Sequence, residues 1–408
     1  MFYFGYGLRV YYICCFVAIL SIKYIQMFSI ILFFLILIIP SFSYAKNDKK
    51  NVLTIDVAAA VEESGAMVNL SDYCSSIEYI PLETTLDAML YQKMPYCTVI
   101  ANKENIFYQS QNSLQVFSAK GKYLKMIGNI GRAKEEYTRI GDVSYYSNTI
   151  QVNDVGANKS IIYDVSGEVL EVVLHRDIEK SFSMNVLSGF MKIEGISFIT
   201  GRSENFNSLC IVMDEKNNIL MRDSLVHKGG GVCSMYLYKD TVSLIYPFAE
   251  VIKGYDNKKL EWVDRFNVKL GKNKALSDGS NIRNSMRLLS DGTVENDRFV
   301  RLRIMYNLPL KSYMRKDKKI VEVIYDKFTG HSFILPYNDE LNGYAFKNDL
   351  DGGLPFVIDN MFENKIYQVV DAIKFIDLAK KSNSKRAREI ADKLTEESNP
   401  IVIVATLR

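Results

Sequence analysis

The stretch IIYDVSGEVLEVV, residues 161–173, carries the pattern that decides the fold of this chain. An apolar strand ends in an aromatic residue and Asp, a short polar turn follows, and a second strand begins. The phrase returns four times, as SLQVFSAKGKYLKMIG from Ser113, LCIVMDEKNNILMRDS from Leu209, VIKGYDNKKLEWVDRF from Val251 and VEVIYDKFTGHSFIL from Val321. A hairpin of this kind cannot bury its apolar face alone, so the repetition predicts hairpins assembled into one larger architecture.

The spacing of the phrases indicates which architecture. Equivalent residues of the first four recur about every 40 to 50 residues, which is typical of propeller blades. The interval from Tyr255 to Tyr325 is longer, so we expect an irregular unit around residues 277–303. Phe356–Val370 supplies strands for a sixth unit, and Ile77–Leu82 is a candidate for the strand that closes the ring. The sequence therefore predicts an all-β fold, a six-bladed β-propeller of four-stranded antiparallel blades, over residues 70–371.

The C-terminal part changes its period. Ala387, Ile390, Ala391 and Leu394 follow the helical i, i+3, i+4, i+7 rule, and Ser382–Ser384 is expected to divide residues 372–397 into two helices. Ile401–Leu407 is an apolar run typical of a buried strand. Residues 372–408 are thus predicted to form a short C-terminal helical appendage packed on the propeller, with a final strand closing onto it. Residues 46–69 are expected to be a lead-in.

The first 45 residues have the layout of a targeting segment. The apolar run FSIILFFLILII begins at Phe28, and the small residues Ser43 and Ala45 precede a polar stretch, so we expect a signal peptide cleaved after Ala45. An uncleaved N-terminal membrane anchor is the alternative, and translation from Met27 stays open. Both alternatives predict an exported protein of the periplasm or cell envelope.

The composition limits the function classes. A formal charge of +3 over 408 residues gives no electrostatic footprint for nucleic acid, which we exclude as a partner. The three His are scattered without ligand spacing, so we expect neither a metal nor another cofactor. Four cysteines follow the leader and allow three disulfide pairings, but a fold of this size favours buried free thiols. They are Cys74, Cys97, Cys210 and Cys233.

Two loops are candidates for ligand binding. Arg132, Glu136 and Tyr137 place a guanidinium, a carboxylate and a phenol on one loop, which could hold a carboxylated sugar or a peptide terminus. The alternative, an ion pair between Arg132 and Glu136 on a rigid turn, is favoured. Asp349 and Asp351 stand before two glycines, as in sites that bind Ca²⁺ through oxygen ligands. Because no further acidic residues follow, a solvated turn is favoured there.

The irregular unit contains a cluster of arginines that could bind anions. They are Arg283, Arg287, Arg298, Arg301 and Arg303. The alternation in RFVRLRI, residues 298–304, favours an ordinary strand with one charged face. The sequence contains no nucleophile elbow, no H-E-x-x-H and no phosphate-binding glycine loop. Carboxylate pairs for glycoside cleavage would meet only in three dimensions.

Several stretches resemble a family of exported six-bladed β-propeller proteins of anaerobic Gram-negative bacteria. Leu70–Thr85 (LSDYCSSIEYIPLETT) resembles the opening of that family, and Asn348–Phe356 and Asn399–Arg408 resemble its closing segments. The family's G-x-G-P-G-E-Y turn corresponds to residues 131–137, where Ala133 and Glu135 replace the two inner glycines. The resemblance spans about residues 70–408 and implies a fold and export rather than a reaction. Many members occur beside proteins that handle glycans at the cell envelope.

Three functional hypotheses remain. The first is a non-catalytic envelope module or scaffold that binds a glycan, a peptide or a partner protein as a monomer. The second is a carbohydrate-active enzyme, a lyase or glycoside hydrolase, with acidic or Tyr/Arg residues at the propeller channel. The third is a membrane-tethered sensor domain, which requires the leader to remain attached. The absence of a catalytic motif favours the first.

Overall fold

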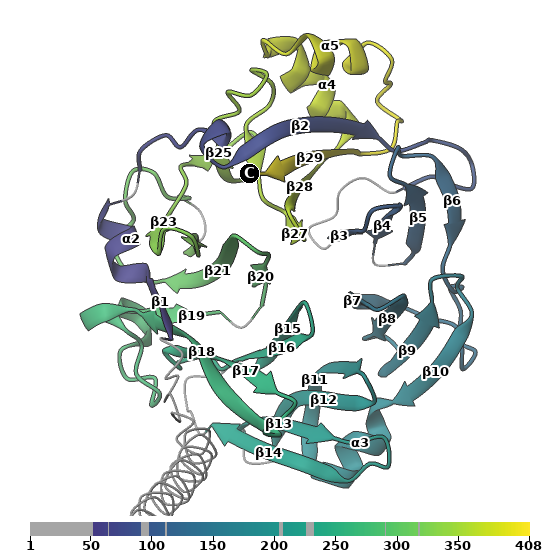
Figure 1. The fold of residues 1–408 in the computed structure, drawn as a ribbon, viewed down its shortest axis with the longest axis vertical. Helices are drawn as coiled ribbons and strands as arrows, with labels where there is room; N and C mark the ends of the chain where they lie inside the picture. The colour runs from purple at the N-terminus through teal and green to yellow at the C-terminus, as the bar shows by residue number, and fades with distance from the viewer. Residues whose placement is uncertain are drawn as a thin grey trace, which may run out of the picture. The chain divides into compact units, whose positions relative to one another are not determined.

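The computed structural model describes residues 52–63, 65–90, 98–110, 112–203, 207–225, 232–289, 291–316 and 319–408. Within the unit formed by residues 52–408, seven sheets surround a common centre (Figure 1). The predicted signal peptide or anchor, residues 1–45, and Cys97 lie outside the described residues. The all-β propeller predicted from the repeated phrases is confirmed.

Four sheets are built from four consecutive strands each, the first of which lies nearest the centre (Figure 1). The first contains β3 (Thr98–Ala101), β4 (Asn105–Gln109), β5 (Leu114–Ser118) and β6 (Tyr123–Met126). The second contains β7 (Ile140–Tyr146), β8 (Thr149–Asp154), β9 (Lys159–Asp164) and β10 (Val169–Leu174). The third contains β11 (Met184–Ile193), β12 (Ile196–Ser203), β13 (Ser208–Met213) and β14 (Ile219–Leu225). The fourth contains β15 (Ser234–Tyr238), β16 (Thr241–Ile245), β17 (Val251–Asp256) and β18 (Glu261–Lys269), with β1 (Leu53–Asp56) parallel to β18 at its outer edge.

Three further sheets complete the ring. The fifth contains β19 (Met286–Leu288), β20 (Val294–Glu295), β21 (Phe299–Tyr306), β22 (Ile320–Asp326) and β23 (His331–Phe333). A small sixth sheet contains β24 (Tyr337–Asn338), β25 (Gly343–Phe346) and β26 (Phe356–Val357). The closing sheet contains β27 (Asn360–Phe362), β28 (Lys365–Val370), β29 (Ile401–Leu407) and β2 (Cys74–Pro81).

The predicted number of six blades is wrong, because the propeller has seven. The stretch Phe356–Val370, expected to supply a sixth blade, is divided between two sheets: β26 belongs to the small sheet, and β27 and β28 belong to the closing sheet. The strands of the small sheet are only two to four residues long, so they do not produce the repeated phrase. The long interval from Tyr255 to Tyr325 holds the inner strands of the fifth sheet.

The repeated phrase is the outer hairpin of a blade. Its Asp fixes the turn by accepting hydrogen bonds from the backbone that follows, as Asx turns do. Asp214 Oδ1 accepts from the N–H of Lys216 at 2.9 Å, and Asp256 Oδ1 accepts from the N–H of Lys258 at 2.9 Å. Ser118 takes the place of Asp in the first sheet and accepts from the N–H of Lys120 at 3.3 Å.

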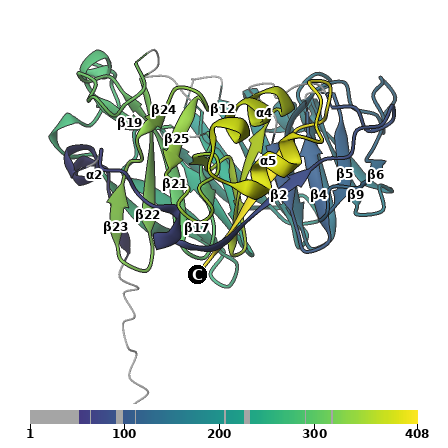
Figure 2. The same ribbon diagram turned by 90° about the horizontal axis from the view of Figure 1, so that it is seen from above.

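The two ends of the unit close the ring. β2 pairs with β29 in antiparallel register from Cys74 opposite Leu407 to Pro81 opposite Ile401. Ahead of β2, the chain passes the fourth, fifth and sixth sheets on the outer side of the ring (Figure 2). This segment contains β1, α2 (Val57–Glu63) and the short 3₁₀ helix η2 (Leu70–Asp72), whose first N–H donates to Lys347 O at 2.8 Å. Residues 46–69, predicted as a lead-in, thus include a strand and a helix.

The C-terminal helices are α4 (Ala372–Lys381) and α5 (Lys385–Ala391). Ser384 ends the gap between them and caps α5, since its Oγ accepts from the N–H of Ala387 at 3.0 Å. Phe375 of α4 is fully buried, with its ring centroid 5.8 Å from that of Tyr79 on β2. Helix α3 (His175–Phe182) and the 3₁₀ helices η3 (Gly271–Asn273) and η4 (Ile282–Asn284) complete the described helices.

A buried ionic network joins the fourth and fifth sheets. The carboxylate of Glu295 on β20 is fully buried and accepts from Arg265 at 2.7 and 2.9 Å, from Lys327 at 2.5 Å and from the Tyr236 hydroxyl at 2.9 Å. Arg265 starts on β18 and reaches Glu295 by lying across β17 at Gly254. A Cβ at position 254 would lie 2.4 Å from Arg265 Cδ, so glycine is required there. Each charged group of this network therefore has a partner among the described residues.

Candidate functional site

The predicted loop at residues 131–137 is held by its own residues. Glu136 Oε2 accepts from the N–H of Ala133 at 2.9 Å, and its carboxylate occupies the space that a side chain on Gly131 would need. The Tyr137 side chain is fully buried and donates to Ile127 O at 3.0 Å, so it cannot reach a ligand. Arg132 is exposed and forms no ion pair with the residues that the structure describes. Glu136 and Tyr137 are therefore engaged by the protein itself, and the expected pairing of Arg132 with Glu136 is not among the ion pairs of the described residues.

The two aspartates of the predicted calcium loop face different partners. Asp349 accepts from the N–H of Ser71 at 2.9 Å and from its hydroxyl at 2.5 Å. Asp351 lies between β2, the loop before β26 and the start of α5. No group of three or more acidic, His or Cys side chains with metal-binding geometry occurs among the described residues. Both carboxylates are used to join segments of the fold.

Asp351 accepts four hydrogen bonds. Its Oδ1 accepts from the Tyr79 hydroxyl at 3.1 Å, from Asn348 Nδ2 at 2.9 Å and from the N–H of Gly353 at 3.0 Å. Its Oδ2 accepts from the Ser384 hydroxyl at 2.6 Å. Burial, reinforced by the Asp351 charge, raises the pKa of Tyr79 well above its usual range, so the phenol stays a donor.

Three of the five arginines of the predicted patch, Arg298, Arg301 and Arg303, have partners within or beside the fifth sheet, whereas Arg283 is exposed in η4. Arg298 pairs with Asp326 at 3.3 Å, and Arg303 pairs with Asp291 at 2.6 Å. Arg301 is buried and donates to Ile358 O and, at 3.2 Å, to Gly292 O. Residues 299–306 form β21, so the interpretation as an ordinary strand is confirmed.

The cysteines that the structure describes are buried free thiols. They are Cys74, Cys210 and Cys233. Burial raises the pKa of Cys74 and of Cys233 to about 12, so neither sulfur is a nucleophile at neutral pH. The expectation of free thiols is confirmed for these three.

A Ser–His pair that the sequence did not reveal lies between the second and third sheets. His175 Nε2 is 2.7 Å from Ser160 Oγ, which donates to Asn153 Oδ1 at 2.5 Å. Ser160 is fully buried, and burial lowers the pKa of His175 to about 4. A nucleophile must be reachable by substrate, so this pair contributes to the core rather than to catalysis.

A set of partly or fully exposed polar and aromatic groups lies on the turns that join the innermost two strands of the second to fifth sheets. We call it the inner-turn surface. It comprises Tyr145, Tyr146, Glu194, Tyr238, Asp240 and Asp297. The strands that carry these residues, β7, β11, β15 and β20, are the ones nearest the centre of the ring (Figure 1). Two-residue turns with left-handed backbone hold them, as at Asn148 (φ 65°) and Glu194 (φ 48°).

Contacts across this surface join blades that are distant in the chain. The Tyr146 hydroxyl, from the second sheet, lies 2.9 Å from Glu194 Oε1 of the third and 3.3 Å from Asp240 Oδ1 of the fourth. The Tyr238 hydroxyl of the fourth sheet donates to Asp297 Oδ1 of the fifth at 2.5 Å. Partial burial and the hydrogen bond to Glu194 raise the pKa of Tyr146, so it remains a phenol.

Tyr145 connects the inner-turn surface to the first sheet and the closing sheet. Asn102 Nδ2 of the first sheet donates to its hydroxyl at 3.3 Å, and its ring centroid is 6.3 Å from that of Phe362 in the closing sheet. The sequence signal for this surface is the tyrosines directly before the two-residue turns, in YYSNT (145–149) and YKDT (238–241). The signal is weak because residues from several blades form the surface, and only the folded ring brings them together.

Comparison with known proteins places the chain in a family. A family model described as a domain of unknown function, DUF4934, matches residues 52–406. The chain belongs to the DUF4934 family. The match begins where the structural unit begins and extends to residue 406, so the family model covers all seven sheets of the propeller. No curated protein matches the chain.

Solved structures agree on the fold. A candidate exported protein of Bacteroides fragilis is 15% identical with a TM-score of 0.58, covering 87% of this chain and 99% of that one. A member of the DUF4221 family from Bacteroides vulgatus is 8% identical with a TM-score of 0.44, covering 82% and 97%. The first similarity establishes the β-propeller fold and nothing beyond it. Among the described residues, no helix has the length and apolar character needed to cross a membrane.

Proposed function

We propose that this DUF4934 protein is an exported, non-catalytic binding module of the cell envelope that recognises a glycan at the inner-turn surface. The observation that carries the proposal is the assembly of Tyr145, Tyr146 and Tyr238 with carboxylates from the inner turns of the third, fourth and fifth sheets. The leader-like segment at residues 1–45 supports export, as does the description of the Bacteroides fragilis structure.

The chemistry of the surface suits a polyhydroxylated ligand. Tyrosine rings offer flat apolar faces for sugar rings, and carboxylate and amide oxygens accept hydrogen bonds from hydroxyl groups. The groups stand on short turns between paired strands, so little conformational entropy is lost when a ligand binds. A peptide or a partner protein would use the same aromatic groups, and these ligands are the alternatives within the proposal.

Binding is tested by a thermal-shift screen of the purified protein against envelope and dietary glycans, peptides and Ca²⁺. A ligand that binds only the folded state raises the melting temperature. Tyr146→Ala is expected to abolish the shift, whereas Tyr337→Ala, at a tyrosine on the small sheet, is the matched control and should keep it. A glycan that shifts both variants equally would overturn the placement of the site.

A glycoside hydrolase is the second candidate, favoured by one specific observation. Glu194 and Asp240 both contact the Tyr146 hydroxyl, so their carboxylate oxygens lie no farther apart than the sum of 2.9 and 3.3 Å. Retaining glycosidases hold their two carboxylates about 5–5.5 Å apart. Release of reducing ends from a bound glycan, lost in both Glu194→Gln and Asp240→Asn, would establish the enzyme. Binding without release by the wild-type protein would exclude it.

A further inference from the structure

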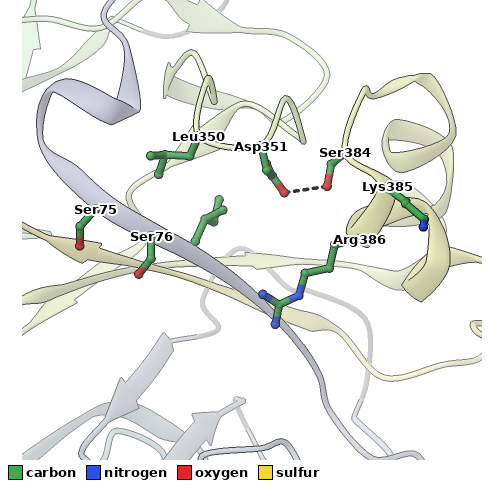
Figure 3. Close-up of a pocket in the computed structure, with 8 residues that line it drawn as sticks. Ser75, Ser76, Leu350, Asp351, Ser384, Lys385 and Arg386 are labelled. Carbon is green, nitrogen blue, oxygen red and sulfur yellow. Dashed lines mark hydrogen bonds between the residues drawn. The ribbon is translucent and has the colours of Figure 1, made fainter.

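A pocket of about 350 Å³ opens beside β2, the outer strand of the closing sheet (Figure 3). The first half of β2 forms one side, the loop before β26 forms the second, and the start of α5 forms the third. Its volume is at the lower end of the roughly 300–1,000 Å³ that small-molecule sites occupy. The pocket is therefore suited to one small group rather than to a macromolecule.

The charge that the pocket offers to a ligand is positive. Of the described residues that line the pocket, one is acidic, Asp351. Both of its carboxylate oxygens already accept the hydrogen bonds given above. Arg386 is exposed and extends from α5 towards β2, whereas Lys385 points away from the pocket (Figure 3). Arg386 makes no hydrogen bond or ion pair with the described part of the chain, so its guanidinium is available.

The rest of the wall combines hydroxyl groups with an apolar floor. Ser75 and Ser76 are exposed on β2, and Leu350 and Ile77 are the apolar residues of the lining. Two sets of hydrogen bonds fix the backbone next to Arg386. Ser384 caps α5 and donates to Asp351, and the N–H of Asn383 donates to Gly352 O at 2.9 Å. The backbone that carries the arginine is therefore rigid before any ligand arrives.

We propose that this pocket binds an acidic sugar residue, a pyranose that carries a carboxylate or a sulfate. Arg386 pairs with the anionic group, because the planar guanidinium donates two parallel hydrogen bonds to such groups. Ser75 and Ser76 bond the ring hydroxyls, and Leu350 and Ile77 contact the apolar face of the ring. The proposal is independent of the inner-turn surface and adds a second site of different chemistry.

The test compares two ligands that differ only in charge. Trigalacturonic acid and its methyl ester are titrated into the protein by isothermal titration calorimetry, and a sulfated chondroitin disaccharide is titrated in parallel. We expect at least one of the two acidic ligands to bind at least tenfold more tightly than the methyl ester, with an affinity that falls as NaCl is raised. Acidic ligands that bind no better than the ester would overturn the proposal.

Substitutions then locate the site. Arg386→Gln should weaken the acidic ligand at least tenfold, and Arg222→Gln, which removes an exposed arginine from β14 of the third sheet, should leave it unchanged. An equal loss in both variants would show that net charge alone attracts the ligand. Retained affinity in Arg386→Gln would place the binding elsewhere. Tyr146→Ala, which tests the inner-turn surface, should not affect this titration.

Discussion

Asp351, which the sequence suggests as a ligand of Ca²⁺, instead joins separate segments of the fold. Its carboxylate joins Tyr79 of the closing sheet to Ser384 at the start of α5. Hydrogen bonds to a charged group contribute about 1.5–3 kcal/mol each in the absence of compensation. Asp351→Ala is expected to lower the free energy of unfolding by about 3 kcal/mol, measured by urea denaturation. Asp349→Ala, which loses contacts only to Ser71, is the control and should cost less than half as much.

His175 predicts a pH dependence of stability. Its folded pKa of about 4 lies below the ordinary value of 6.5, because the imidazole is buried. Between those values the unfolded chain binds a proton that the folded chain does not, so stability falls as the pH is lowered from 6.5 and the loss is complete below about 4. The shift corresponds to about 3 kcal/mol.

The measurement is a urea unfolding series from pH 7 to pH 4 on the wild-type protein and on His175→Gln, which keeps a polar side chain beside Ser160 but does not titrate. Aspartates of the outer turns lose their contribution in both proteins, so only the difference between the two curves reports on His175. We expect the wild-type protein to lose about 3 kcal/mol more than the variant. Parallel curves would contradict the prediction.

At the scale of the elements, the outer hairpins were predictable because their determinants are local. Asp214, Asp256 and the glycine or asparagine of each turn lie within five residues of one another, and the Asp fixes the turn through its own neighbours. The small sheet was not predictable, because β24 and β26 are two residues each, which is too short to produce an alternating pattern. The inner-turn surface was not predictable because its contacts are not local: Tyr146 and Asp240 are 94 residues apart.

The fourth blade offers a test of how one glycine permits an ionic junction. Gly254→Ala places a methyl group against the Arg265 side chain, whose guanidinium is fixed by Glu295. We expect the variant to be about 2 kcal/mol less stable, because the methyl group displaces Arg265 and the buried Glu295 carboxylate then loses one of its cationic partners. In the Arg265→Ala background the same substitution should cost under about 1 kcal/mol, because the side-chain atoms that lie across β17 are then absent.

A double-mutant cycle by urea denaturation measures that difference. A coupling energy of about 1 kcal/mol or more between positions 254 and 265 is the expected result. Additive effects would show that Gly254 is required for the backbone of β17 alone. The neighbouring Lys253→Ala, on the same strand but directed at Asp223, serves as the control and should not couple to Arg265.

At the scale of the whole unit, the ring is held by two devices. β2 and β29 join the ends of residues 70–408 in one sheet, so the closing blade cannot form until both ends are present. The segment ahead of β2 adds a second connection. β1 extends the fourth sheet, and the N–H of Asp56 donates to Ser332 Oγ of the fifth at 3.1 Å. This segment therefore bridges two blades that share no strand.

Removal of residues 52–63 tests the bridge. Ile55, Val57 and Ala60 are fully buried, and Val61 nearly so, which makes their burial worth on the order of 5 kcal/mol. A protein beginning at Gly65 should still form the β2–β29 closure but unfold at lower urea than one beginning at Val52. Hydrogen exchange should locate the loss at β18 and β23, next to the deleted strand and helix. Protection lost evenly around the ring would show instead that the segment stabilises the propeller as a whole, without a particular role at the junction of the fourth and fifth blades.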